Sequence, residues 1–386
     1  MVYTLAHLQE AMKMFHRSDK PYTRYEGTPK QICRYIVSRC WNGVYFQVST
    51  GHFTAFYCRD FGMCAQSLCN LGYTREVRAT LSWALDIFSH NKKITTTITK
   101  RAQAIDCFAF ACDSLPFLLH ALQVSGDKKL ITKNKSFIEK QAVIYFEKVF
   151  DKNTHLVKEK GAFSSIKDHY VRKSSCYDNC MVGWLITTMQ QLGYELPQAA
   201  KTKTEHSKAI DMRKQILTRF WTGTYFKDDL YSDVASSDAQ FFPFYTKIFD
   251  AKKRDKKIWA LANKKIDEQQ LAYPFPIKYT KVRDKKKELF IPSLLVPNYE
   301  GTTLWIHLGL CYLTVLAQTD KRATAKHLDT YTKLVAKHKN FFELFNEDGT
   351  PYKSKYYQSD ESMSWASIYL DLSQQIHQPK KEQRIP

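Results

Sequence analysis

Apolar side chains recur at helical spacing along most of the 386-residue chain. Positions three and four residues apart lie on one face of a helix, so this pattern predicts amphipathic helices that bury that face. The clearest expected helices cover residues 61–88, 113–124, 136–149, 179–192, 207–220, 303–317, 323–338 and 362–375. Breaks at Leu-Gly-Tyr (71–73 and 192–194) and short polar connections favour antiparallel neighbours. The proline-bearing stretch 272–297 is expected to form a long loop.

A second pattern repeats where helices end. An aromatic pair is followed by a turn through Asn, Asp, Gly or Thr and then by a bulky or aromatic residue, in the segments 40–46, 146–157, 220–229 and 341–352. Repetition at this scale indicates a repeated structural unit, here a helical hairpin that stacks on its neighbours. An open solenoid and a two-lobed bundle are the alternatives. Because the units differ too much for a regular solenoid, we expect a closed toroid.

Composition narrows the class of protein. Gly (13) and Pro (12) are scarce, which argues against a fold of many short strands, whereas 44% hydrophobic and 14% aromatic residues supply a large core and an aromatic-lined cleft. The excess of 58 Lys and Arg over 38 Asp and Glu gives a formal net charge of +20. Much of it lies in Lys-rich runs, which we interpret as solvated surface, at 128–135, 201–208, 251–257 and 278–287. No zinc-knuckle, KH-loop or RNP-like motif accompanies this charge, so nucleic acid is not expected as a partner.

The ten cysteines include no Cys-x2-Cys pair, and the closest spacings are Cys64/Cys69, Cys107/Cys112 and Cys176/Cys180. We interpret them as reduced thiols of the core rather than disulfides or metal ligands. The N-terminal segment is not a signal peptide, and no window reaches the roughly 18 apolar residues of a membrane span. A cytoplasmic protein without membrane contact is therefore expected. No Walker loop or GxGxxG motif occurs, so no cofactor or metal is expected.

Acidic residues stand beside aromatic ones at several expected junctions between a loop and a helix. The segments are 57–63, 174–184, 298–309, 341–349 and 357–365. Aromatic faces stack on the apolar side of sugar rings, and carboxylates bind the hydroxyl groups. A single Asp at a helix start is commonly an N-cap. In a ring of hairpins, however, such junctions gather at one mouth, so together they predict a carbohydrate-binding cleft.

At these residues the chain resembles the clan of (α/α)6 glycosidases that includes the amylo-1,6-glucosidase domain of glycogen debranching enzymes and the neutral/alkaline invertases. Arg59-Asp60-Phe61 is similar to an early element whose Asp holds the sugar in the cleaved subsite. The segment Tyr177-Asp178-Asn179 is similar to the one that supplies the general acid in invertase-like members.

Two later segments extend the resemblance. GTTLWIHLGL (301–310) resembles a Gly-x-x-Trp-Pro-His element, with Ile306 where proline is usual. FFELFNEDGTPY (341–352), followed by SMSWASIYL, is similar to a late element in which a Glu before an Asn/Asp-Gly turn is the general base and a Trp-Ser pair follows. The resemblance runs from about residue 40 to 375 in element order.

The resemblance implies an all-α (α/α)6 barrel, a single domain over residues 1–386, with short turns or small β-hairpins at the cleft rim. It implies an inverting glycoside hydrolase for an α-glucosidic oligosaccharide or disaccharide, in which Asp178 protonates the leaving oxygen and Glu343 activates water. Glu300 and Glu361 are rival candidates for the base. The expected substrate-binding residues are Arg59, Asp60, Tyr177, Asn179, Glu300, Trp305, His307 and Trp365.

Other functions stay open at this point. The same fold could carry a sugar phosphorylase, an epimerase or a lyase, and the basic stretch 166–175 would suit a phosphorylated sugar. A catalytically silent toroid could instead bind carbohydrate or another protein. The oligomeric state, the sugar and the linkage are not determined by the sequence.

Overall fold

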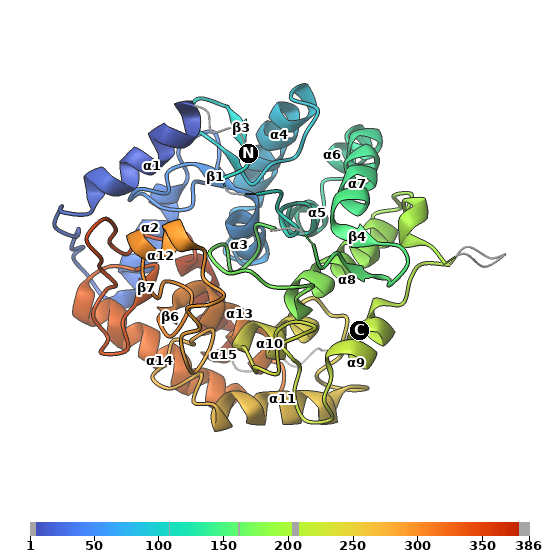
Figure 1. Ribbon diagram of the computed structural model, residues 1–386. Coiled ribbons are helices and arrows are strands. Elements are labelled where there is room, and N and C mark those ends of the chain that lie inside the picture. The colour runs from blue at the N-terminus through green and yellow to red at the C-terminus, as the bar shows by residue number, and fades with distance from the viewer. Residues whose placement is uncertain (1–4, 108, 161–162, 203–207, 378–386) are drawn as a thin grey trace, which may run out of the picture.

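The computed structural model describes residues 5–107, 109–160, 163–202 and 208–377. In this part of the chain, six helices follow one another around a closed inner ring (Figure 1). They are α3 (Cys58–Asn70), α5 (Ser114–Ser125), α8 (Cys176–Gln191), α10 (Ser237–Tyr245), α13 (Ile306–Leu316) and α15 (Ala366–His377). Each contacts the next, and α15 returns to contact both α13 and α3, which closes the ring.

An outer layer of helices alternates with the inner ones along the chain. It consists of α2 (Pro29–Cys40), α4 (Thr74–His90), α7 (Lys135–Val149), α9 (Met212–Phe220), α11 (Lys256–Glu268) and α14 (Lys321–His338), with the short α6 (Lys128–Lys133) preceding α7. Inner helices are packed on all sides, and α8 buries 13 of its 16 residues, whereas α11 buries three of 13. This arrangement is the (α/α)6 barrel that the sequence predicts.

Short strands and two further helices complete the described elements. β1 (Phe56–Tyr57), β2 (Thr97–Ile98) and β3 (Ala104–Ile105) form an antiparallel sheet in that order. β4 (Phe150–Asp151) pairs with β5 (Leu156–Val157), and β6 (Leu304–Trp305) pairs with β7 (Leu344–Phe345), both antiparallel. A 3-10 turn, η1, covers Gln198–Ala200. Helices α1 (Leu5–Arg17) and α12 (Phe290–Leu295) lie outside the two helical layers.

The repeated aromatic turns are small β structures that follow outer helices, as predicted. Trp41 bridges Phe46 after α2, and Trp221 bridges Phe226 after α9. The segment after α7 forms the β4–β5 hairpin. Gly43 and Gly223 adopt φ of +93° and +101°, a backbone conformation that side chains with a Cβ rarely take. The turn glycine is therefore required by the hairpin geometry.

Element boundaries differ from the periodic pattern in identifiable places. The segment 61–88 is two helices, α3 and α4, separated at the predicted Leu-Gly-Tyr break (71–73). The helix expected at 207–220 begins at Met212, because the Asp211 side chain caps it by accepting a bond from the Lys214 amide, and residue 207 lies outside the described residues. The stretch 272–297 is largely irregular but contains α12.

Close packing of the inner ring depends on glycine. A Cβ added to Gly62 on α3 would lie 2.5 Å from the Cβ of Phe117 on α5, and one on Gly309 would lie 2.4 Å from the Tyr331 hydroxyl. Real Cβ atoms essentially never approach so closely. Because glycine has no Cβ, neighbouring helices can approach closely at these two points.

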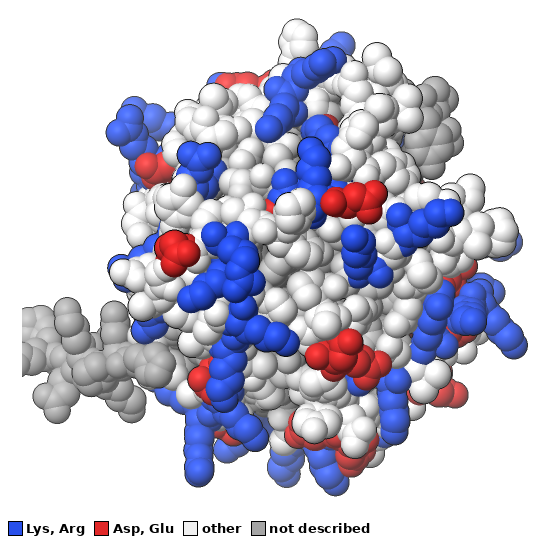
Figure 2. Space-filling view, turned by 90° about the vertical axis from the view of Figure 1, so that its left-hand side faces the viewer, with Lys and Arg blue, Asp and Glu red and all other residues white. Residues whose placement is uncertain are grey.

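The cysteines are mostly buried, and the Lys and Arg side chains are dispersed over the surface. All ten cysteines are free, and eight of them are buried. Figure 2 shows Lys and Arg side chains dispersed over one face of the molecule, with uncharged and acidic side chains between them. Part of the 201–208 run, residues 203–207, lies outside the described residues. Among the helices described, none is both long enough and apolar enough to cross a membrane.

Candidate active site

A cavity of about 960 Å³ lies where several inner helices begin. Seven of the sequence-predicted site residues line it: Arg59, Asp60, Glu300, Trp305, His307, Glu343 and Trp365. Arg59 and Asp60 lie in the first turn of α3, and His307 lies in the first turn of α13. Trp365 immediately precedes α15, and the Glu343 backbone carbonyl accepts a bond from the Ile306 amide at the start of α13. The ring thus brings together side chains that are far apart in the sequence.

Glu343 is held by three hydrogen-bond donors. The hydroxyl of Tyr299 donates to Oε1, the hydroxyl of Tyr357 donates to Oε2 at 2.5 Å, and the Asp360 amide donates to Oε2 at 2.9 Å. The side chain is 2% exposed. Burial raises the pKa of Glu343 to about 8, although the three donors act in the opposite direction by stabilising the carboxylate. Glu343 can therefore exchange a proton near neutral pH.

A second carboxyl, Asp60, lies in an aromatic setting. Trp365 donates its Nε1–H to Oδ1 at 3.0 Å, and burial raises the pKa of Asp60 to about 6. The ring of His307 lies 4.7 Å from that of Trp365 and 4.9 Å from that of Trp305. Burial lowers the pKa of His307 to about 3, so the imidazole is neutral. Its Nδ1 is buried and has no hydrogen-bond partner in the described structure.

Arg59 connects the cavity to the layer behind it. Its Nε donates to Asp113 at 2.7 Å, and its terminal nitrogens donate to the two oxygens of Asp168 at 3.1 and 3.2 Å. Asp113 is fully buried and also accepts a bond from the Tyr177 hydroxyl at 2.9 Å. Tyr177 itself does not line the cavity. It therefore supports Arg59 from behind, in contrast to its predicted place in the substrate site.

Asp168 lines the cavity but is absent from the residues selected in the sequence. It lies on the connection between β5 and α8, within the stretch 166–175. Besides Arg59, it accepts bonds from the Ser164 hydroxyl at 2.5 Å and the Ser165 amide at 3.0 Å. Arg59 and these donors hold the pKa of Asp168 below its usual value. The segment attracts attention in the sequence for its basic charge, and nothing local in it indicates that Asp168 meets Arg59.

Glu300 fixes the loop that carries Asp168. Its two oxygens accept bonds from the Asp168 and His169 amides, each at 2.8 Å, and the residue is 3% exposed. Burial raises the pKa of Glu300 to about 8. The His169 ring in turn stacks on Tyr299 with centroids 5.1 Å apart. Glu300 thereby links the Asp168 loop to the surroundings of Glu343.

Asp178 does not line the cavity. It is 4% exposed, its Oδ1 accepts a bond from the Cys112 thiol at 2.9 Å, and its amide donates to Ser175, the N-cap of α8. Asn179, also absent from the lining, uses its side chain to bind the backbone of Val157 and of Ser175. Both predicted residues therefore lie in the layer behind the cavity.

Glu361, the other rival for the base, is also outside the cavity lining. It accepts bonds from the Thr23 amide at 2.7 Å and from the Asn340 side chain at 2.8 Å, and it forms an ion pair with Arg17 at the end of α1. These contacts tie the N-terminal segment to the barrel. Glu361 is thus placed as a structural anchor.

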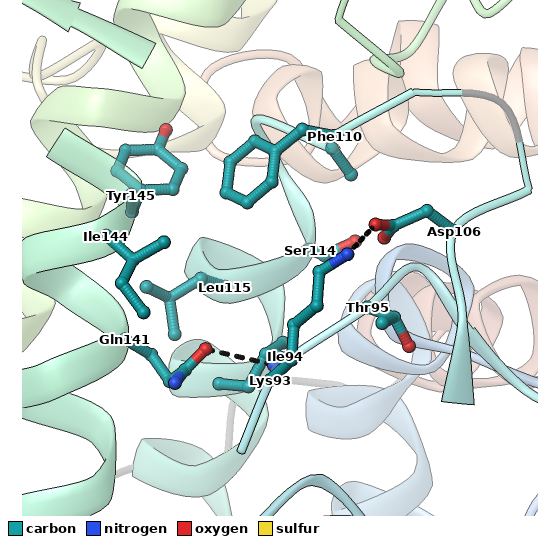
Figure 3. A pocket seen from close by; sticks show the side chains of 11 residues that line it. Lys93, Ile94, Thr95, Asp106, Phe110, Ser114, Leu115, Gln141, Ile144 and Tyr145 are labelled. Atoms are coloured by element: carbon teal, nitrogen blue, oxygen red, sulfur yellow. Dashed lines mark hydrogen bonds and ion pairs between the residues drawn. The ribbon is translucent and has the colours of Figure 1, made fainter. Parts of the chain in front are cut away.

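A second, far smaller hollow lies beside the barrel (Figure 3). It measures about 20 Å³, and Lys93 forms an ion pair with Asp106 at its edge while Gln141 accepts a bond from the Ile94 amide. A volume of this size holds about one water molecule. The 960 Å³ cavity is therefore the candidate ligand site. Within the described ranges, no three His, Cys, Asp or Glu side chains are grouped as metal ligands.

Comparison with known proteins shows the fold. No family model and no curated protein matches the sequence. Among solved structures, the chain is similar to a rhamnosidase from Klebsiella oxytoca with rhamnose bound, at 10% identity and TM-score 0.61, covering 92% of this chain and 65% of that one. The chain therefore shares the fold of this protein.

Two other similar structures match over nearly their whole length. One is a wild-type glycosidase, at 10% identity and TM-score 0.61, with 95% of this chain and 98% of that chain covered. The other is a GH63 mannosylglycerate hydrolase from Thermus thermophilus, at 9% identity and TM-score 0.61, with 89% and 99% covered. The similarity therefore extends over the whole barrel of each of these two structures.

Proposed function

We propose that the protein is a glycoside hydrolase that uses two carboxyl groups from opposite parts of the chain. The observation that carries this proposal is the convergence of Glu343, Asp168 and Asp60 on one cavity. Two tryptophans and a neutral histidine with an unbonded Nδ1 lie beside them. Carboxyl groups for proton transfer and aromatic faces for sugar stacking are the parts that glycoside hydrolysis needs. The similar solved structures, named as glycosidases, support the same chemistry.

Glu343 is the proposed general base. A base works best when its pKa lies near the operating pH, and the pKa of about 8 meets this condition. Three donors to the carboxylate orient its oxygens, so that it can take a proton from water as that water attacks the anomeric carbon. Direct attack by water would invert the anomeric configuration, with a carboxyl separation of roughly 6.5–9.5 Å.

For the proton donor we propose Asp168. The resemblance places the acid at Asp178 in the first turn of α8, but Asp178 does not line the cavity, whereas Asp168 on the connection before α8 does. The side chain of Asp168 is 20% exposed in the ligand-free protein. A bound glycoside would remove this remaining solvent and raise the pKa of Asp168, which counteracts the effect of Arg59. Proton donation to the leaving oxygen requires that the bound glycoside offset the effect of Arg59 on the pKa of Asp168.

Asp60 and His307 are the proposed contacts to the sugar itself. Asp60 accepts a bond from Trp365 through Oδ1, and its carboxyl can also accept from a sugar hydroxyl. The neutral His307 ring also lines the cavity and can bind another hydroxyl through a ring nitrogen. Trp305 and Trp365 offer aromatic surface on either side of His307. The sugar is expected to be an α-glucoside, as the resemblance implies.

The test is hydrolysis of a panel of α- and β-linked glycosides, with the anomer of the first product read by NMR. We expect inversion for the substrate that is cleaved. Glu343→Gln and Asp168→Asn should each reduce kcat by about 10²–10⁴-fold. Failure of the whole panel, or full activity of Glu343→Gln, would overturn the proposal, and strict dependence on inorganic phosphate would indicate phosphorolysis instead.

Activated leaving groups identify the acid. Fluoride departs from a glycosyl fluoride without being protonated. The variant that has lost the acid should therefore retain most of its activity on a glycosyl fluoride, whereas the Glu343 variant should not. We expect Asp168→Asn to behave in this way. Asp178→Asn and Asp60→Asn serve as matched comparisons. If one of them alone loses hydrolysis of the glycoside but retains hydrolysis of the fluoride, the acid role passes to that residue.

A further inference from the structure

The outer part of the cavity is apolar and open to solvent. Six exposed large hydrophobic residues of the described chain also line it: Leu8, Phe15, Val171, Phe290, Ile291 and Tyr356. Phe290 and Ile291 are 75% and 68% exposed on α12, although residues of this type are normally buried. An exposed patch of this kind, bordering a cavity, marks a binding surface.

Helix α1 also lines this outer part of the cavity, here called the rim, and it carries an apolar stripe. Leu5, Leu8, Met12 and Phe15 recur at helical spacing, and each is at least 44% exposed. An amphipathic helix usually turns such a stripe toward the core. Here Leu8 and Phe15 line the cavity instead, and the Phe15 ring contacts that of Tyr356 at 6.2 Å. Figure 1 shows α1 and α12 on the same side of the barrel.

Polar and apolar groups divide the cavity into two parts. The carboxyl groups, Arg59, His307 and the tryptophans lie where the inner helices begin. The α1 and α12 surfaces that line the outer part carry mainly Leu, Ile, Phe, Met, Ala, Val and Pro. On α1 the polar lining residues are His7 and Glu10, which bind the Asp106 carbonyl and Lys13 respectively. Further sugar units would need hydrogen-bonding groups in this outer part, and aliphatic side chains do not provide them.

We propose that the natural substrate is a glycoside whose leaving group is an extended apolar chain. This inference rests on the proposed hydrolase function and names its substrate class. The sugar lies among the carboxyl groups, and the apolar aglycone lies between α1 and α12. The rim is continuous with the carboxyl-bearing floor, so one ligand fills both parts. Hydrolysis releases the sugar and the corresponding alcohol, and water supplies the hydroxyl group of the sugar and the proton of the alcohol.

Binding of paired alkyl glycosides tests the proposal. Methyl and n-octyl glycosides of glucose, mannose and rhamnose, in both anomers and below the micelle concentration, are titrated calorimetrically into the 386-residue protein carrying Glu343→Gln. Each methylene that becomes fully buried should tighten binding about fourfold. Because the rim stays partly open, we expect the octyl glycoside of the accepted sugar to bind at least about 30-fold more tightly than its methyl counterpart. Equal affinity, or tighter binding of an oligosaccharide than of the octyl glycoside, would overturn the proposal.

Rim variants locate the effect. Phe290→Gln combined with Ile291→Gln should lower the octyl-to-methyl affinity ratio at least tenfold. Val143→Gln combined with Leu261→Gln alters two exposed apolar residues of the outer helices, 43% and 39% exposed, and should leave the ratio unchanged. An unchanged ratio in the rim variant, with its helical circular dichroism intact, would refute the placement between α1 and α12.

Other occupants of the rim give different results. Binding to sugar-free phosphatidylcholine vesicles as tightly as to octyl glycosides, lost in the same rim variant, would indicate a membrane surface and overturn the aglycone site. A dimer in sedimentation that the rim variant dissociates would assign the patch to a second copy and also overturn it. Tight, rim-dependent octyl binding by a protein that hydrolyses nothing would support the apolar site while refuting the hydrolase function.

Discussion

Substitution of Tyr357 by Phe should shift the pH dependence of the enzyme toward higher pH. The hydroxyl of Tyr357 donates to Glu343 Oε2 at 2.5 Å and stabilises the carboxylate form. A hydrogen bond to a charged group is worth about 1.5–3 kcal/mol, and one pKa unit corresponds to about 1.36 kcal/mol. Loss of the bond should therefore raise the pKa of Glu343 by about one to two units above its value near 8. Because a base must be ionised, the acidic limb of activity should move with it.

The assay is kcat/KM measured across the pH range with the substrate identified in the panel. Below the limb, Tyr357→Phe should lose about 10–100-fold in kcat/KM relative to wild type, and the loss should shrink at alkaline pH. Tyr352→Phe is the control, because the Tyr352 hydroxyl donates to the Pro297 carbonyl at 2.8 Å although its ring contacts that of Tyr357. A limb that stays in place, or moves to lower pH, would refute Glu343 as the base that Tyr357 stabilises.

Two predictions concern the barrel. Gly62→Ala would place a Cβ 2.5 Å from the Phe117 Cβ, so we expect a loss of about 1–3 kcal/mol or more in the free energy of unfolding by urea, and unchanged stability would mean that α3 and α5 approach less closely. Arg59→Gln would leave Asp113, fully buried, without its cation, with an expected loss of about 3–5 kcal/mol. Burial raises the pKa of Asp113 to about 6 even beside Arg59, so this loss should grow as pH rises above about 6, where the variant's buried carboxyl keeps a proton that the wild type releases. A loss that is independent of pH would contradict the role of the ion pair.

Local sequence patterns predict the helices and turns because their causes are local. The periodicity of 323–338 and the break at 71–73 arise from contacts a few residues apart and from glycine conformation, and α14 and the α3–α4 boundary follow them. Helix α1 shows the limit of this reasoning. Its apolar stripe has the spacing of a core helix, yet the barrel leaves that stripe exposed at the cavity rim. Periodicity identifies an apolar face, and only the tertiary arrangement decides what covers it.

The site divides in the same way between local and long-range causes. Asp60 and His307 lie in first turns of inner helices, so motif and helix start together predict them. Asp168 lies in an irregular connection, and its place is fixed by Arg59, 109 positions earlier, and by Glu300, 132 positions later. No pattern within the connection contains this information. The sequence therefore selects Asp178, ten positions later, and does not indicate that Asp168 lines the cavity.

An aspartate in the first turn of an inner helix lines the cavity only where no other segment of the chain separates that turn from the cavity. At α3 the first turn faces the cavity, and Asp60 is part of the lining. At α8 the preceding connection intervenes: Asp168 lines the cavity, while Arg172 of the same connection lies over the Tyr177 ring at 5.9 Å. Ser175 already caps α8, so Asp178 is not needed there as a cap. The equivalent starts of two inner helices can thus carry one aspartate in the cavity and one behind it, depending on the loop that enters each.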